Sequence, residues 1–275
     1  MRLIETVDFD NIDCWAPNLT VVLRSVVTDS VIERLAGAKF EFIEDALDFL
    51  FTLTDSDAVT DAVLAWITSV NIMGYHGTRL TDEEVTSIKN NGLLPLEAKL
   101  RRNRLARALS FHPKWSEVAD RLDAVIEAYG KNNRAGNREG QVHLTLSKAG
   151  LVHGFNHYLA FGSEFDQRVA QYLLGEEGKK LLSLYGKPRI IEIALPGNLA
   201  LGAAHPYFGI DDMRRKGDVP NLVNEFLKAW SYRISNPNFQ SRKLEIDCGM
   251  IFYKTIPANW IVNVKTLEDF HNERC

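Results

Sequence analysis

The feature that most constrains the fold is a junction between a strand and a helix near residues 72–92. An apolar run leads into a glycine-bearing segment with adjacent hydrogen-bonding side chains, Gly74-Tyr75-His76-Gly77-Thr78-Arg79. A capping box at Thr81-Asp82-Glu83-Glu84 begins a helix, and Asn90-Asn91-Gly92 stops it. Since glycine lets a backbone approach a ligand closely, the junction is a candidate ligand site. His76 alone is equally compatible with a structural histidine hydrogen-bonded inside a core.

The composition is that of a soluble globular protein, with 45% hydrophobic and 25% charged residues. There is no window of about 18 apolar residues, so no membrane span is expected. The N-terminus turns acidic before a signal-peptide core forms, which favours a cytoplasmic location. Three widely spaced cysteines suggest neither a disulfide framework nor a zinc site.

The net charge of −4 argues against coating nucleic acid by bulk attraction. Positive charge is nevertheless clustered in three places: Lys99, Arg101, Arg102, Arg104 and Arg107; Lys131, Arg134 and Arg138; Arg214, Arg215 and Lys216. Such clusters are solvated faces or phosphate-binding surfaces, and the sequence leaves both readings open.

The first quarter of the chain is predicted to be helical. Apolar residues recur at three- and four-residue steps from about residue 19 to residue 69, and Gly37 and Asp55-Ser56-Asp57 separate the segments. We therefore expect an N-terminal helical region at 1–70, followed by a domain at 71–275. Residues 97–130 are again helical in pattern, and 131–140 are polar and glycine-bearing, which predicts a mobile loop.

Short strands are interleaved with helices in the rest of the chain. Strands are predicted at 2–7, 141–146, 156–161, 189–196 and 244–253, with another after residue 256, and a helix at 223–230. Helices first and short strands afterwards predict an α+β fold with a mostly antiparallel sheet.

Two further segments carry candidate site residues. Tyr158 precedes Gly162-Ser163-Glu164, where Ser163 is a natural N-cap, so an aromatic face and a helix N-terminus are near each other. In Glu245-Ile246-Asp247 the period of a strand points both carboxylates to one face. Two carboxylates on an otherwise apolar strand are costly unless they are solvated or functional.

Together these segments resemble the ADP-ribosyltransferases, in the branch shared by diphtheria-type toxins and poly(ADP-ribose) polymerases. Tyr75-His76-Gly77-Thr78 resembles the first family motif, the segment from Tyr158 to Tyr172 the second, and the segment from Asp247 to Ile261 the third. The resemblance covers roughly residues 72–96 and 140–265. It implies a split antiparallel sheet core, with a helical insertion at about 97–138 lying outside it.

The sequence departs from the family pattern in two places. The acidic position falls on Asp247 where the family usually has Glu, so Glu245 is an alternative for that role. The second motif strand is also ambiguous, because Val142-His143-Leu144-Thr145 fits it and would put His143 in place of Tyr158.

The resemblance implies NAD as substrate and no metal. It implies that His76 hydrogen-bonds the adenosine-side ribose and that the backbone of Gly77 and Thr78 binds the nicotinamide amide. It also implies that Tyr158 stacks on the nicotinamide ring. Arg79 and Ser163 are further candidates for contact with the dinucleotide. The resemblance makes Asp247 the carboxylate that stabilises an oxocarbenium-like transition state, and Glu245 the group that orients the nucleophile.

The implied activity is mono-ADP-ribosylation of a macromolecule, with RNA or DNA slightly favoured over protein because of the basic clusters. Relatives of this kind include toxins and anti-phage effectors, so an antitoxin protein is a candidate partner. Alternatives are an NAD glycohydrolase and a degenerate NAD- or nucleic-acid-binding module. An RNA 2′-phosphotransferase ranks lower, since Arg79 is the one arginine beside the first motif.

Overall fold

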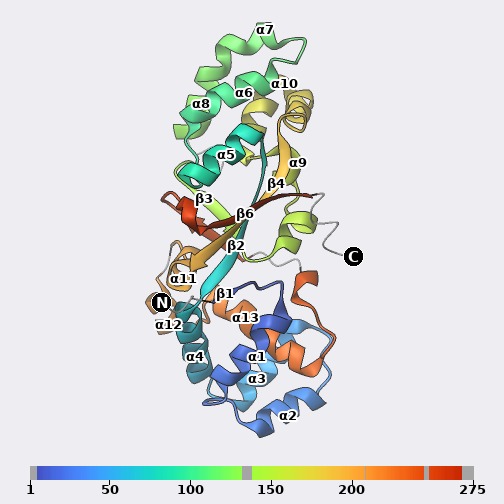
Figure 1. Ribbon diagram of the computed structural model, residues 1–275, viewed down its shortest axis with the longest axis vertical. Helices are drawn as coiled ribbons and strands as arrows, with labels where there is room; N and C mark the ends of the chain where they lie inside the picture. The colour runs from blue at the N-terminus through green and yellow to red at the C-terminus, as the bar shows by residue number, and fades with distance from the viewer. Residues whose placement is uncertain (1–4, 132–137, 208, 245–247, 268–275) are drawn as a thin grey trace. The chain divides into compact units, whose positions relative to one another are not determined.

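The computed structural model describes residues 5–131, 138–207, 209–244 and 248–267, and these form an α+β fold (Figure 1). Within them lie thirteen α-helices and a six-stranded sheet. The α+β class predicted from the sequence is therefore confirmed, while the split-sheet arrangement stays a prediction. None of the helices in the described ranges is long and apolar enough to cross a membrane.

The predicted N-terminal helices are present. Their bounds are α1 Ile12–Leu23, α2 Asp29–Gly37, α3 Ile43–Leu53 and α4 Ser56–Ser69. The turn predicted at Asp55 begins α4, because its carboxylate accepts hydrogen bonds from the backbone N–H groups of Asp57 and Ala58 at 3.0 and 3.2 Å. The apolar face of each helix is buried, as the spacing predicts.

The sheet has the strand order β5-β3-β2-β4-β6, and β1 pairs with β2. The strands are β1 Thr6–Val7, β2 Asn71–Leu80, β3 Val142–Thr145, β4 Lys187–Pro196, β5 Gly249–Phe252 and β6 Ile261–Thr266. β1 and β2 are parallel, whereas β4 and β6 are antiparallel with a register shift at Glu192/Ile193. The predicted strand that carries His76 is thus β2.

The chain divides into two compact units. The first contains residues 1–74, 145–150 and 194–250, and the second contains 75–144, 151–193 and 251–275. The predicted division at 70/71 differs from this one, because residues 194–250 return to the N-terminal helices. That return forms a tertiary contact, which local periodicity does not encode.

The first unit is held together by an aromatic cluster around Phe226 on α13 (Asn221–Ser235). The rings of Trp15, Trp66 and Phe9 meet the Phe226 ring edge to face, with centroids 5.0, 5.2 and 5.3 Å away. The remaining elements of this unit are α11 Gly197–Ala204, α12 Ile210–Arg215 and the 3₁₀ turn η4 Ser241–Lys243.

The second unit has its own core between α6, α8 and α10 (Figure 1). Its helices are α5 Asp82–Asn91, α6 Arg102–Leu109, α7 Trp115–Val118, α8 Leu122–Lys131, α9 His157–Phe161 and α10 Glu164–Leu182. Short turns are η1 Ala98–Arg101, η2 Ala119–Arg121 and η5 Ala258–Trp260, and a π-helical turn, η3 Gly150–Gly154, joins the two units. The insertion predicted at 97–138 is helical up to residue 131, and 132–137, where a mobile loop was predicted, lie outside the described residues.

Two predicted strands are corrected. Residues 156–161 were predicted to be extended, but His157–Phe161 form helix α9, closed by the N–H of Gly162 donating to the carbonyl of Tyr158 at 2.9 Å. Gly162 adopts φ +82°, which favours glycine and ends the helix. The strand predicted at 244–253 is observed at Gly249–Phe252, with Leu244 capping η4 and Tyr253 outside the strand. Residues 245–247 lie outside the described residues.

Candidate functional site

A cavity of about 270 Å³ lies in the second unit. It is lined by residues of β2 and β3, of helix α5 and the segment after it, and of the start of α10. Its polar lining side chains are His76, Thr78, Glu84, Ser87, Glu97, Arg101, Arg138, Gln141, His143, Tyr158, Ser163 and Glu164. Segments far apart in the sequence therefore meet at one concave site, which is typical of ligand-binding sites.

His76 lines the cavity from β2 and is neutral. Its Nδ1 lies 2.8 Å from the backbone carbonyl oxygen of His143 on β3. Because a carbonyl only accepts, Nδ1 carries the proton and Nε2 keeps a lone pair for a hydrogen-bond donor. Burial lowers the pKa of His76, and the positive charge of Arg101 lowers it further, against the hydrogen bond to His143.

Gly77 and Thr78 follow on the same strand and also line the cavity. An added Cβ at Gly77 would lie 3.1 Å from a methyl of Leu151 and 3.3 Å from a methyl of Leu159, both buried. Packing against these leucines is thus a second reason for glycine here, beside close approach of a ligand. Thr78 is 9% exposed.

Arg79 does not line the cavity, so we do not retain it as a ligand-binding residue. Its guanidinium donates to backbone carbonyls of four residues: Tyr185 at 3.3 Å, Leu159 at 3.3 Å, Ala160 at 3.5 Å and Gly186 at 2.6 Å. These contacts tie β2 to helix α9 and to the turn before β4. Burial lowers its pKa, with a further contribution from the charge of Arg104.

Tyr158 reaches the cavity from helix α9, not from the strand that was predicted. Its hydroxyl donates to Oε1 of Glu164 at 2.9 Å, and Nε of Arg138 donates to Oε2 of the same carboxylate at 3.0 Å. Burial works against ionisation of Glu164, but these two hydrogen bonds and the charge of Arg138 hold its pKa below the ordinary value. Glu164 thus fixes the Tyr158 hydroxyl at the cavity.

His143, the alternative to Tyr158, lines the same cavity. Its Nε2 lies 2.8 Å from Oε1 of Gln141, and Nη1 of Arg138 contacts the ring nitrogens at 3.0 Å. Burial lowers the pKa of His143 to about 4, and the charge of Arg138 adds to that effect. Since both candidates reach the cavity, the choice between them stays open.

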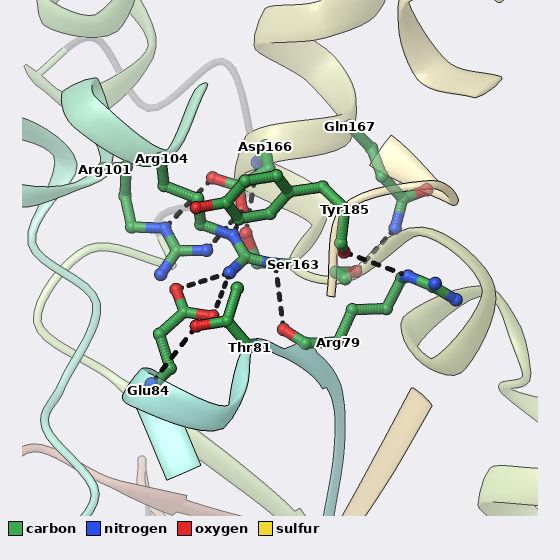
Figure 2. A network of polar contacts seen from close by, with 10 residues as sticks. Arg79, Thr81, Glu84, Arg101, Arg104, Ser163, Asp166, Gln167 and Tyr185 are labelled. Atoms are coloured by element: carbon green, nitrogen blue, oxygen red, sulfur yellow. Dashed lines mark hydrogen bonds and ion pairs between the residues drawn. The ribbon is translucent and has the colours of Figure 1, made fainter. Parts of the chain in front are cut away.

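Ser163 is the N-cap of α10, as predicted, and its hydroxyl accepts from the backbone N–H of Asp166 at 3.1 Å. The Asp166 carboxylate then meets two arginines (Figure 2). Nε of Arg101 donates to Oδ1 at 3.0 Å, Nη2 of Arg101 donates to Oδ2, and Nε of Arg104 lies 3.4 Å from Oδ2.

Arg104 links this group to the capping box of α5. Its Nη1 pairs with the carboxylate of Glu84, and its Nη2 donates to the backbone carbonyl of Arg79 at 2.8 Å (Figure 2). Glu84 also accepts from the backbone N–H of Thr81 at 2.8 Å, which confirms the predicted capping box. Burial opposes ionisation of Asp166, yet Arg101 and Arg104 hold its pKa below the ordinary value.

The sequence did not single out Glu164 or Asp166, and it offered Arg101, Arg104 and Arg138 as members of basic clusters. Several cluster arginines turn out to be ion-paired within the protein: Arg101 with Asp166, Arg102 with Asp123, Arg104 with Glu84, Arg138 with Glu164, Arg214 with Asp61 and Arg215 with Asp212. The positive charge available to an external polyanion is correspondingly smaller. Glu245 and Asp247 lie outside the described residues, so their roles stay predictions.

Comparison of the chain with protein-family models, curated proteins and solved structures finds no match. The function is therefore argued from the cavity and its residues. Within the described ranges, no group of three or more His, Cys, Asp or Glu side chains is arranged to hold a metal ion.

Proposed function

We propose that this chain is an NAD-dependent mono-ADP-ribosyltransferase that binds NAD in the cavity of the second unit. The observation that carries the proposal is that His76 of the first motif and Tyr158 and Ser163 of the second motif line one cavity. The cavity volume of about 270 Å³ lies just below the lower end, roughly 300 Å³, of the range for small-molecule sites.

The protonation state of the site supports recognition of a nucleoside. Neutral His76 offers Nε2 as an acceptor for a ribose hydroxyl, whose O–H can donate. Tyr158 offers an aromatic side chain that is held at its hydroxyl by Glu164 and lies beside the ring of His157, with centroids 4.1 Å apart. In the proposal this side chain stacks on the nicotinamide ring. Gly77 and Thr78 supply backbone groups for the carboxamide.

In the proposed reaction the glycosidic bond between the ribose carbon and the nicotinamide nitrogen breaks, and nicotinamide leaves with the bonding electron pair. A nucleophile of the acceptor forms the new bond to the ribose carbon and loses its proton. A carboxylate stabilises the positive charge that develops on the ribose. Asp247 takes that role in the proposal and Glu245 orients the nucleophile, both on the sequence resemblance.

Glu164 is a less suitable candidate for the charge-stabilising carboxylate. Both of its oxygens are already engaged, one by Tyr158 and the other by Arg138. Reassigning it to a developing cation would leave Arg138 without its partner. We therefore give Glu164 the task of holding Tyr158.

The acceptor is proposed to be a macromolecule, with RNA tested first and DNA and protein beside it. The experiment is incubation of the full chain with NAD labelled in the adenylate phosphate and each acceptor separately. Label transfer to one acceptor, lost in Asp247→Ala, supports the transferase. Glu245→Ala, measured in parallel, shows which carboxylate carries the reaction.

An NAD glycohydrolase is the second candidate, because the same cavity would serve water as the acceptor. Release of nicotinamide without label on any acceptor would replace the transferase by the hydrolase. Binding of NAD without release of nicotinamide would indicate a binding module. Absence of both binding and release would reject NAD as the ligand.

A further inference from the structure

Arg101 belongs to the helical insertion and lines the cavity, but the proposed reaction assigns it no role. It ends the η1 turn, its side chain is 25% exposed, and it lines the cavity on which His76 and Ser163 converge. Its positive charge also contributes to the lowered pKa of His76, which lines the same cavity. A cation at this cavity calls for an explanation.

The guanidinium of Arg101 is held in one orientation. Two of its nitrogens, Nε and Nη2, donate to the two oxygens of Asp166, whose side chain is 1% exposed. This paired geometry fixes the plane of the guanidinium as well as its position. Asp166 is fixed in turn, since Ser163 caps its backbone N–H and Arg104 contacts Oδ2.

One nitrogen of Arg101, Nη1, has no hydrogen-bond partner among the described residues. The pairing with Asp166 therefore leaves a donor edge that a ligand can use. An arginine that is bound on one edge and available on the other loses little side-chain entropy when it binds an anion.

The network around Arg101 carries more positive than negative charge (Figure 2). Its guanidinium groups are Arg79, Arg101 and Arg104, and its carboxylates are Glu84 and Asp166. Three cations and two anions leave a net charge of +1. Arg79 is satisfied by backbone carbonyls, so its charge has no carboxylate partner in this network. The charged side chains that line the cavity itself are Arg101, Arg138, Glu84, Glu97 and Glu164, and Glu84 and Glu164 are paired with Arg104 and Arg138. The open donor edge of Arg101, rather than a net charge of the cavity, therefore favours an anionic ligand group.

We propose that Arg101 binds a phosphate group of the ligand through its Nη1 edge, with Asp166 as the residue that positions it. The proposal rests on the proposed function, in which that group belongs to the diphosphate of NAD. It assigns a part of substrate recognition to the helical insertion, which lies outside the family resemblance. The ligand class is then a nucleotide, and a nucleoside lacking phosphate would miss this contact.

The rival explanation is that Arg101 serves only to neutralise buried Asp166. The two explanations differ in what a second substitution does. Arg101→Gln alone leaves Asp166 with Arg104 as its one charged partner, and the loss of a buried partner can unfold the protein. The double variant Arg101→Gln/Asp166→Asn removes both charges and keeps two hydrogen-bonding side chains of similar shape.

The experiment is calorimetric titration of wild type, Arg101→Gln and the double variant with NAD and with nicotinamide riboside, which has no phosphate. We expect both variants to bind NAD about 10- to 100-fold more weakly, the range for a hydrogen bond to a charged group. Their affinity for nicotinamide riboside should stay within about twofold of wild type. Arg102→Gln is the matched control, since Arg102 is the neighbouring arginine, pairs with exposed Asp123 and does not line the cavity.

Recovery of wild-type NAD affinity in the double variant would overturn the proposal in favour of a purely structural ion pair. Equal weakening of NAD and nicotinamide riboside would also overturn it, because it would indicate a changed cavity. If wild type binds neither ligand, the proposed function fails. The anion site is then tested separately, by measuring thermal stability with inorganic pyrophosphate. Thermal stabilisation by pyrophosphate in wild type but not in the double variant would retain the phosphate contact for another nucleotide, and no stabilisation would reject it.

Discussion

Nδ1 of His76 lies 2.8 Å from the carbonyl oxygen of His143, so the first motif of the cavity is joined directly to the strand that holds the alternative second motif. One consequence is a neutral His76 that carries its proton on Nδ1. The ¹⁵N chemical shifts of the ring should report this tautomer in the free protein. A mixture of tautomers near neutral pH would contradict the hydrogen bond.

The lowered pKa of His76 predicts that mild acidification weakens NAD binding less than it would with an ordinary histidine. With an ordinary pKa of about 6.5, only about a quarter of the rings would be neutral at pH 6.0. Burial and Arg101 lower that pKa, so more of the rings keep the acceptor form at pH 6.0, and the loss of affinity from pH 8.0 to pH 6.0 should be smaller than about fourfold. The check is calorimetry at both pH values. A fall of about fourfold, absent in His76→Gln, would show an unshifted histidine.

Two glycines at the cavity should differ in their tolerance of alanine. Gly92 adopts φ +84°, and a Cβ there would overlap the carbonyl oxygen of Ile256, so Gly92→Ala should cost at least about 2 kcal/mol of unfolding free energy. Gly77→Ala meets only leucine methyl groups and should cost about 1 kcal/mol. Urea denaturation checks the order. Gly202→Ala, with no atom within 4 Å in helix α11, is the control and should be neutral or stabilising.

Asp166 should be far more important for stability than an exposed acidic residue in a similar pair. Asp166→Ala leaves Arg101 and Arg104 without their shared buried carboxylate and should cost about 3–5 kcal/mol. Asp123→Ala removes the 65% exposed partner of Arg102 and should cost less than about 1 kcal/mol. Chemical denaturation of both variants measures the difference. Equal losses would mean that the Asp166 network contributes no more than a surface pair.

Replacing Asp10 of the first unit with a neutral residue should stabilise the protein, by an amount that depends on pH. Burial, with a smaller effect of Asp8, raises its pKa from 3.8 to about 6. A raised carboxyl pKa means that the folded state binds the proton more tightly, so this group costs stability above pH 6 and the cost fades as the pH falls towards 4. Asp10→Asn should therefore raise the unfolding free energy at pH 8 by at most about 3 kcal/mol, from about two pKa units.

The measurement is urea denaturation of Asp10→Asn and wild type at pH 8 and at about pH 4. The advantage of the variant should be largest at pH 8 and small at the lower pH. The asparagine can keep hydrogen bonds to Ser147 and to the backbone N–H of Lys148, which Asp10 now accepts at 2.7 and 2.9 Å. A destabilised variant at pH 8 would show that these two contacts outweigh the burial of the charge.

The fold was predictable where short-range chemistry decides it. The capping box of Thr81 with Glu84 and the N-cap Ser163 involve residues three apart, and both form as predicted. Helix α9 was missed because its five residues are too few to show a helical period. The grouping of residues 194–250 with the N-terminal helices depends on Phe226 packing between Trp15 and Trp66, which no local pattern reveals.

The residues of the candidate site were likewise predictable only where a local motif marks them. His76, Tyr158 and Ser163 were found through motifs, and the structure brings them to one cavity. The pairing of Arg101 with Asp166, 65 residues apart, was not visible, since any acidic residue could have served that arginine. Glu164 stands next to Ser163, and a hydrogen bond to a tyrosine six residues earlier leaves no signature in the sequence.

The central claim is that the cavity lined by His76 and Tyr158 binds NAD and breaks its nicotinamide bond. The most direct test is the rate of nicotinamide release from NAD by wild type, Tyr158→Ala and Tyr207→Ala, with RNA, DNA and protein acceptors present. Tyr207 is 73% exposed in the first unit and serves as the control. We expect release by wild type and Tyr207→Ala, and a loss of at least about tenfold in Tyr158→Ala. Equal release by all three proteins, or no release and no NAD binding by wild type, would contradict the claim.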